Sequence, residues 1–184
     1  VPYNSLFANH EPMPRITRND DDIYMLYTGG TTGMPKGVMY QMGSLVEGFV
    51  NGGLAFIGMT PPSEFSQLST TVRDAHANGI RPITIPGCPL MHGTGMWIGA
   101  MMPQSGGAHV VTLQKRSFDA HELFQVIQDK KATLAVVVGD SFVKPMIRAL
   151  DEATAKGTAY DASSLKMIAS SGVMWTSEVK EALL

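Results

Sequence analysis

Residues 134–138 read Leu134-Ala135-Val136-Val137-Val138, a continuous apolar run in which no polar residue alternates with the apolar ones. Runs of this kind are typical of β-strands that are covered on both faces, as the strands of parallel sheets are. The sequence on either side of the run has helical periodicity. The run therefore predicts a fold in which buried strands and helices alternate.

Each of the two neighbouring helices has recognisable ends. Before the strand, Ser117 can N-cap a helix with Asp119 in its first turn and Lys130-Lys131 in its last, where each charge suits the helix dipole. After the strand, we expect a helix with Pro145 near its first turn, where a missing N–H costs little, and with its end at Lys156-Gly157. The apolar residues recur at helical spacing, as Ala120, Leu123, Phe124 and Ile127 in the first helix and as Phe142, Met146, Ala149, Leu150 and Ala153 in the second.

Three further strands are expected, at residues 80–85, 110–113 and 166–169. Thr176 can cap a final helix that has Glu178 in its first turn. The second half of the chain then has the order βαβαβα. This order indicates an α/β fold, a three-layer sandwich with a largely parallel sheet.

The first half of the chain is less regular. Residues 22–27 and 37–40 read as two short strands, and residues 41–50 read as a helix weakened by glycine. Residues 58–79 are polar, with Pro61-Pro62-Ser63-Glu64 near the start of the stretch. We therefore expect residues 58–79 to form a surface excursion with one short helix.

A glycine-rich loop joins the two short strands and reads Tyr27-Thr28-Gly29-Gly30-Thr31-Thr32-Gly33-Met34-Pro35-Lys36-Gly37-Val38. Its small side chains let backbone N–H groups approach a ligand closely, and its Thr hydroxyls and Lys36 add donors for anionic oxygens. This combination indicates a phosphate cradle. The Walker A spacing is not met, because Pro35 precedes and Gly37 follows Lys36, and Thr31 breaks the dinucleotide fingerprint. A flexible surface loop between hairpin strands is the alternative.

The overall composition limits the class of protein. The chain has 184 residues, a net charge of −2 and 44% hydrophobic residues, which fits one globular domain and argues against nucleic acid or an anionic membrane as the main partner. Cys88 is the single cysteine, so no internal disulfide can form, which is compatible with a reducing cytosol. No apolar stretch is long enough to span a bilayer. The chain begins at Val1 and stops within a helical pattern, so we expect a segment of a longer protein, with a naturally short protein as the alternative.

The cradle closely resembles the phosphate-binding signature of the adenylate-forming enzymes, Tyr-Thr-Ser-Gly-Thr-Thr-Gly-x-Pro-Lys-Gly-Val, with Gly29 in place of the usual Ser. This superfamily contains the acyl- and aryl-CoA synthetases, the peptide-synthetase adenylation domains and the luciferases. The resemblance implies that the cradle binds the phosphates of ATP and that Lys36 is catalytic. The cradle residues are Thr28, Gly29, Gly30, Thr31, Thr32, Gly33 and Lys36.

Two weaker motifs follow in the order of the family. His92 comes after a strand, where a side chain can reach the carboxyl edge of the sheet, and residues 89–95 resemble the family's Pro-x-x-His motif, whose His lies beside the carboxylate that is activated. Residues 169–176 resemble Gly-Gly-Ala-Pro-Leu-Ser, whose backbone lines the adenine, which assigns the nucleotide to Ser171, Gly172, Val173 and Met174. The alternatives are a histidine without a functional role and an ordinary strand-to-helix turn.

The resemblance implies an acyl-CoA synthetase, which joins a carboxylic acid, here a fatty acid, to ATP and then transfers the acyl group to coenzyme A. The Mg²⁺ ligand of the family lies outside this chain, and Asp20-Asp21-Asp22 is expected to be a solvated acidic cap. Residues 1–184 would be a single partial domain that is cytoplasmic, inactive alone and able to self-associate through bared apolar faces. An amino-acid adenylation domain and a non-catalytic nucleotide- or anion-binding module are the alternatives.

Overall fold

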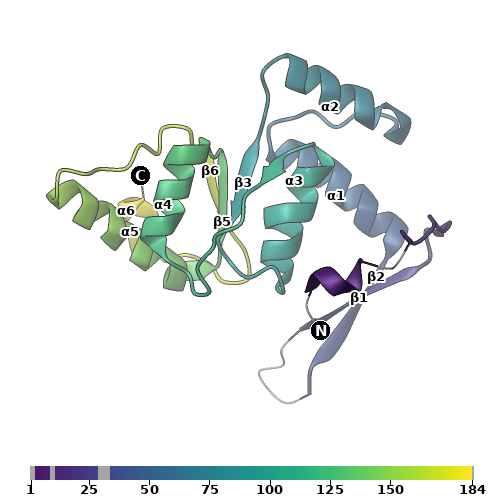
Figure 1. The fold of residues 1–184 in the computed structure, drawn as a ribbon, viewed down its shortest axis with the longest axis horizontal. Coiled ribbons are helices and arrows are strands. Elements are labelled where there is room, and N and C mark those ends of the chain that lie inside the picture. Colours follow the sequence, from purple (N-terminus) through teal and green to yellow (C-terminus); the bar gives the residue numbers. More distant parts are fainter. Residues whose placement is uncertain (1–2, 9–10, 29–33, 184) are drawn as a thin grey trace. The chain divides into compact units, whose positions relative to one another are not determined.

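The computed structural model describes residues 3–8, 11–28 and 34–183 of the chain. These residues fall into two units, Val1–Leu45 and Val46–Leu184, which are described separately below (Figure 1). No helix among the described residues is long and apolar enough to cross a membrane. The glycine-rich residues 29–33 lie outside the described part of the chain.

The first unit contains the expected hairpin. Strand β1 (Ile23–Thr28) pairs antiparallel with β2 (Lys36–Gln41), and the register runs from Ile23 opposite Gln41 to Thr28 opposite Lys36. A short 3-10 helix, η1 (Tyr3–Leu6), precedes it. Helix α1 (Met42–Phe56) begins where β2 ends. The N–H groups of Met42 and Gly43 donate to the carbonyls of Asp22 and Asp20, at 2.8 and 3.0 Å, so the acidic stretch caps this helix through its backbone.

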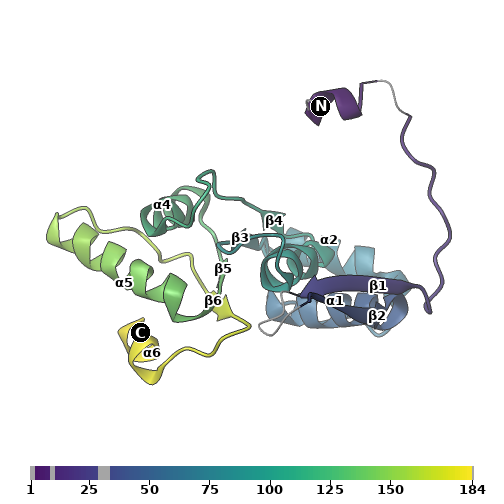
Figure 2. The same ribbon diagram turned by 90° about the horizontal axis from the view of Figure 1, so that it is seen from below.

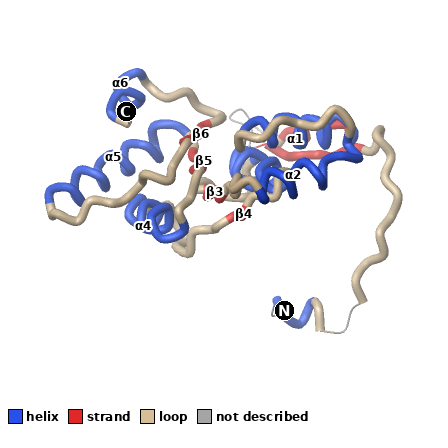
Figure 3. Tube along the Cα trace, turned by 90° about the horizontal axis from the view of Figure 1, so that it is seen from above, coloured by secondary structure: helices blue, strands red, loops and turns tan. Residues whose placement is uncertain are grey.

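The second unit is built on a four-stranded sheet whose strands are all parallel. The strands are β3 (Ile83–Pro86), β4 (His109–Val110), β5 (Leu134–Val137) and β6 (Met167–Ser170), and their order is β4-β3-β5-β6 (Figure 3). Every residue of β5 is buried. The predicted central parallel strand is confirmed over residues 134–137, and Val138 is the N-cap of the helix that follows.

Helices cover both faces of this sheet. Ala135 and Val137 of β5 face the core formed with α4 (Ala120–Lys130), α5 (Gly139–Ala155) and α6 (Ser177–Ala182). Leu134 and Val136 face the opposite way, toward Ile98 of the helical segment η3 (Thr94–Met101), which continues into α3 (Met102–Ser105). Figure 1 shows α4 and α3 on opposite sides of the strands. The three-layer α/β sandwich is confirmed.

The helix η3 was not expected from the sequence. It is a wide helix of the π type that ends with the Met102 N–H donating to the Trp97 carbonyl. Its fit to the sheet depends on the absence of a side chain, because a Cβ at Gly99 would lie 2.7 Å from the Pro86 Cβ. The Thr84 hydroxyl also donates to the Gly99 carbonyl at 3.1 Å, which satisfies a buried polar side chain.

Several predicted boundaries were wrong. The N-cap of α4 is Asp119 rather than Ser117, because the Asp119 carboxylate accepts the Glu122 N–H at 3.0 Å. Pro145 lies in the interior of α5 rather than near its first turn, because the helix starts earlier, at Gly139, directly after β5. Strand β4 covers only His109–Val110 and not residues 110–113. Helix α1 continues beyond residue 50 to Phe56, and its later turns bury Gly53 and Leu54.

Residues 58–79 contain the expected short helix, α2 (Leu68–Ala77), preceded by the 3-10 turn η2 (Phe65–Gln67). The helix lies on a small core of its own, formed by Val50, Leu54 and Met59. The excursion is therefore a folded layer attached to α1.

Candidate functional site

The order of the strands indicates where a ligand can bind. The chain leaves β3 toward β4 on one side and leaves β5 toward β6 on the other, although β3 and β5 are neighbours. In open α/β sheets, this reversal opens a crevice at the carboxyl ends of the two strands, and ligands bind there. The loops that follow β3, β5 and β6 all reach this carboxyl edge.

The loop after β3 carries His92. The Gly87 N–H donates to the Val136 carbonyl at 2.8 Å, which extends the pairing with β5 by one residue. The chain then turns, since the His92 N–H donates to the Pro89 carbonyl at 3.1 Å and the His92 carbonyl accepts the Met96 N–H at 2.9 Å. A Cβ at Gly95 would lie 2.4 Å from the Pro89 carbonyl oxygen, so only glycine fits at this close approach. The side chain of His92 is exposed at the start of η3.

A single hydroxyl ties the loops after β5 and β6 together. The Gly139 N–H donates to Ser170 Oγ at 2.9 Å, and Ser170 Oγ donates to the Val173 carbonyl at 3.4 Å. Gly139 has a φ of 61°, and a Cβ there would lie 3.0 Å from the Val173 Cβ. The turn that starts α5 thus determines where the loop after β6 lies.

The loop after β6 forms a hollow of about 430 Å³, which we name the β6 hollow. The chain can be followed from β6 through this loop to α6 in Figure 2. Val173 and Met174 leave 60% and 84% of their surface exposed. The lining residues are Ser170, Ser171, Gly172, Val173, Met174, Trp175 and Lys180. Exposed backbone, two apolar side chains and one cation can hold a flat ring that bears an anionic group.

Asp140 fixes the far end of this loop. Its two carboxylate oxygens accept the Thr176 N–H at 3.2 Å and the Thr176 hydroxyl at 3.0 Å, and Lys144 lies 3.9 Å away. Thr176 in turn accepts the Val179 N–H and caps α6, as predicted. Sequence reasoning missed this role of Asp140, because the contact joins residues that are far apart in the chain.

A second hollow, of about 380 Å³, lies between the loops after β3 and β4, and we name it the β4 hollow. Its walls include the buried Cys88, the pKa of whose thiol is raised by desolvation, and the rings of Phe118 and Phe142, whose centroids are 4.7 Å apart. Lys115 and Arg116 lie at its rim. Sequence reasoning also missed these two cations, although two adjacent basic residues shortly after a predicted strand are a usable signal.

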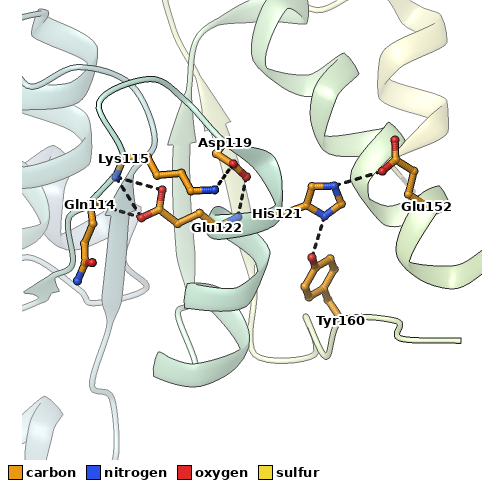
Figure 4. A network of polar contacts seen from close by, with 7 residues as sticks. All are labelled: Gln114, Lys115, Asp119, His121, Glu122, Glu152 and Tyr160. Atoms are coloured by element: carbon orange, nitrogen blue, oxygen red, sulfur yellow. Dashed lines mark hydrogen bonds and ion pairs between the residues drawn. The ribbon is translucent and has the colours of Figure 1, made fainter. Parts of the chain in front are cut away.

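The polar groups around Lys115 already have partners (Figure 4). The Lys115 ammonium pairs with the Asp119 carboxylate, and this hydrogen bond lowers the pKa of Asp119 and raises that of Lys115. The Glu122 carboxylate accepts the backbone N–H groups of Gln114 and Lys115, at 2.6 and 3.3 Å. These contacts hold the loop in place. Arg116, the other cation that lines the hollow, takes no part in them.

His121 makes a separate set of contacts on the exposed side of α4. Its Nδ1 lies 2.9 Å from the Tyr160 hydroxyl and its Nε2 lies 3.3 Å from Glu152, which joins α4 to α5 (Figure 4). In the described part of the chain, no three His, Cys, Asp or Glu side chains converge to hold a metal ion.

The structure brings only some of the predicted site residues together. Ser171, Gly172, Val173 and Met174 share the β6 hollow. His92 follows β3, and β5 separates that strand from β6, so residues 171–174 form no hydrogen bond with His92 among the described contacts. In the first unit, Thr28 and Lys36 are register partners at the end of the hairpin that the glycine-rich loop joins. The other cradle residues, Gly29, Gly30, Thr31, Thr32 and Gly33, lie outside the described residues.

Comparison with known proteins shows which family the chain matches. The profile described as "AMP-binding enzyme" matches residues 2–184. The chain is 35% identical over 186 residues to the 3-oxocholest-4-en-26-oate--CoA ligase of Rhodococcus rhodochrous, covering 100% of this chain and 32% of that protein. It is 32% identical to the medium-chain acyl-CoA ligase Mig of Mycobacterium avium, again covering 100% of this chain and 32% of the relative. The chain thus spans about a third of the length of the curated relatives it matches.

Solved structures agree on the fold. The N-terminal domain of FACL13 from Mycobacterium tuberculosis matches 92% of this chain with a TM-score of 0.64 and 16% identity, over 36% of its own length. The O-succinylbenzoate coenzyme A synthetase (MenE) of Bacillus subtilis, in complex with AMP, matches 99% of this chain with a TM-score of 0.63 and 18% identity, over 39% of its length. From the profile, which matches nearly the whole chain, it follows that this chain belongs to the AMP-binding enzyme family.

Proposed function

We propose that the chain forms part of the nucleotide- and acid-binding region of an acyl-CoA synthetase that activates a fatty acid. The observation that carries the proposal is the identity of 32–35% over the whole chain with relatives named as CoA ligases of a sterol side-chain acid and of medium-chain acids. The reaction belongs to a longer protein, because the relatives are about three times as long as this chain. It would use ATP, Mg²⁺ and coenzyme A, with the metal held by residues outside this chain.

The cradle would hold the phosphates that leave as pyrophosphate. In adenylate formation the acid attacks the α-phosphorus, so catalysis consists mainly of positioning the reactants and neutralising charge. Each charge-assisted hydrogen bond to a phosphate oxygen contributes about 1.5–3 kcal/mol. The residues assigned to this role are Thr28, Gly29, Gly30, Thr31, Thr32, Gly33 and Lys36, with Lys36 as the catalytic cation.

The carboxyl edge of the sheet would hold the rest of the acyl-adenylate. The exposed backbone and apolar side chains of the β6 hollow support its assignment to the adenine, with Ser171, Gly172, Val173 and Met174 as the binding residues. The exposed position of His92 after β3 supports its assignment to the carboxylate. A small-molecule substrate fits this edge, and a cytoplasmic location fits the lone thiol of Cys88, which is stable in a reducing compartment.

Two alternatives make different predictions. An amino-acid adenylation domain needs an acidic residue for the substrate amine, whereas the residues after His92 are Gly93, Thr94 and Gly95, which carry no charge. A non-catalytic nucleotide- or anion-binding module would bind ATP without exchanging pyrophosphate.

Pyrophosphate exchange in the whole protein tests the proposal. Lys36→Ala should lower the rate of fatty-acid-dependent exchange by about 10- to 100-fold, since it removes one charge-assisted contact to the leaving group. Lys130→Ala, an exposed cation in the last turn of α4, is the matched control and should leave the rate unchanged. Exchange that depends on an amino acid instead would favour the first alternative, and ATP binding without exchange would favour the second.

The 184-residue chain by itself is proposed to form no thioester from ATP, coenzyme A and a fatty acid. We also propose that it self-associates, because Met91 and Met174 leave 80% and 84% of their surface exposed. Thioester produced by the chain alone, above a Lys36→Ala background, would contradict the first statement. A monomer in sedimentation velocity at every concentration would contradict the second.

A further inference from the structure

The segment 58–79 forms a pocket that the proposed function does not use. Helix α2 packs through one stripe, Leu68, Val72 and Ala75, on the core beneath it. The next stripe lines a pocket of about 510 Å³ with Ser69, Arg73 and His76, which follow one another at i, i+4 and i+7. The opposite wall is the end of α3, with Gln104 and Ser105, and the turn that follows it, with Gly107. This turn leads into the amino end of β4, so the pocket lies away from the carboxyl edge.

The pocket is lined by basic side chains and not by acidic ones among the described residues. None of the described residues that line it is Asp or Glu. The guanidinium of Arg73 donates to the Thr70 hydroxyl at 3.3 Å, and no carboxylate among the described residues lies within ion-pairing distance of it. An arginine held beside a hollow without an acidic partner is suited to binding an anion, because its planar fork matches two oxygens at once.

His76 supplies an independent observation. Its Nε2 is buried and has no hydrogen-bond partner among the described residues, although the same ring lines the pocket. The ring lies against Gly107, where a Cβ would be 2.9 Å from His76 Cε1 and 2.8 Å from Val72 Cγ1. Gly107 also has a φ of 73°, which favours glycine. Buried polar atoms in native proteins are nearly always paired, so the unpaired ring nitrogen shows that this wall of the pocket has unused hydrogen-bonding capacity.

We propose that this pocket binds a small soluble oxyanion of the phosphate or sulfate kind. Arg73 is the main cation, the Ser69 hydroxyl and the Gln104 amide are further donors, and the His76 ring forms part of the wall. The proposal does not depend on the acyl-CoA synthetase reaction, since none of these residues lies at the carboxyl edge.

Titration of the chain with inorganic phosphate, followed through the imidazole signals of His76 in NMR spectra, tests the proposal. The titration uses the Lys36→Ala variant, which lacks the cradle cation. The pH is held constant, and chloride keeps the ionic strength the same at every phosphate concentration. We expect a saturable shift of the His76 signals with phosphate. Arg73→Gln should weaken the binding at least tenfold, because it removes the charge-assisted contact. Arg81→Gln, an exposed cation outside the pocket, is the matched control and should keep the affinity.

The outcomes separate the possibilities. Arg73 is exposed on α2, so Arg73→Gln should keep the circular dichroism spectrum of the parent chain. Phosphate binding that Arg73→Gln leaves unchanged, or that Arg81→Gln weakens equally, would overturn the proposal. Ser69→Ala should weaken phosphate binding as well, though less than Arg73→Gln. Binding to phosphatidic acid vesicles without any response to inorganic phosphate would assign the surface to a lipid and would also overturn it.

Discussion

The two hollows at the carboxyl edge of the sheet differ in how their polar groups are satisfied. In the β4 hollow, Lys115 pairs with Asp119, and Glu122 accepts two backbone N–H groups of the same loop. In the β6 hollow, Ser170 Oγ and the Asp140 carboxylate hold the two ends of the loop, and Val173 and Met174 remain exposed toward solvent. The difference is that the β4 hollow uses most of its charged groups for contacts within the protein, whereas the β6 hollow leaves apolar side chains open to solvent.

The largest effect should come from the turn that positions the β6 hollow. Gly139→Ala places a side chain at a φ of 61° and a Cβ 3.0 Å from the Val173 Cβ. We expect the strained backbone position to lower the free energy of unfolding by about 1–3 kcal/mol, and the close contact with Val173 to lower it further. Gly157→Ala is the control, since its φ of 69° is similar but nothing lies within 4 Å of the added Cβ. Urea unfolding of both variants measures the difference, and equal losses would show that Val173 does not matter.

The hydroxyl behind the β6 hollow should have the next largest effect. Ser170→Ala removes the acceptor of the partly buried Gly139 N–H, which should cost about 1–2 kcal/mol of stability. Ser141→Ala removes an exposed hydroxyl bond to the Val138 carbonyl and should cost less. Thermal unfolding of the two variants makes the comparison. If Ser141→Ala were the more destabilising of the two, Ser170 would not be the residue that holds the loop.

Asp119, in the loop that follows β4, has two roles that can be tested separately, as the N-cap of α4 and as a charged partner of Lys115. Asp119→Ala removes the N-cap of α4 and should cost about 1 kcal/mol of stability, whereas Asp119→Asn keeps a good cap and loses only the charge. The pKa of Asp119 is lowered in the folded state, so its charge stabilises the fold above the ordinary carboxyl pKa and ceases to do so as the pH falls. Unfolding measured from neutral to acidic pH should show the gap between the parent chain and Asp119→Asn closing. A gap that widened in acid would contradict the ion pair.

The smallest effect is expected away from both hollows. The Lys131 ammonium lies 2.6 Å from the Asp161 carboxylate, and this contact, with help from Ser163, strongly lowers the pKa of Asp161. Both groups are exposed, so Asp161→Asn should lower the melting temperature only slightly at neutral pH. The difference should disappear in acid, since a carboxyl whose pKa is lowered on folding stabilises only while it is charged. A melting temperature that fell equally at both pH values would assign the effect to packing instead.

The central strand of the sheet could be predicted from the sequence, whereas the helix η3, which covers one face of the sheet, could not. Residues 134–138 indicated a buried parallel strand without ambiguity, and the two amphipathic helices beside it followed from helical spacing. Helix η3 was missed because its apolar residues show no helical face. Its position depends on the contacts of Gly95 and Gly99 with Pro89 and Pro86, which are not visible in the sequence.

The candidate site was predictable only in its local parts. The loops after β3 and β6 were expected from their place after strands, and Thr176 was expected as a cap. The bonds that fix their geometry join Ser170 to Gly139 and Asp140 to Thr176, which are far apart in the chain. The N-cap of α4 is Asp119 and not Ser117, and the same carboxylate also pairs with Lys115.

The position of Trp175 has a practical consequence. The chain holds two tryptophans, and they report on different places. Trp175 lines the β6 hollow, whereas Trp97 lies in η3, with its ring 5.6 Å from that of Phe49. Indole emission depends on what surrounds the ring, so a nucleotide that stacks in the hollow would quench Trp175 and leave Trp97 bright. If the proposed nucleotide site lies there, Trp175 reports its occupancy with Trp97 as the internal reference, and Trp175→Phe silences the probe alone.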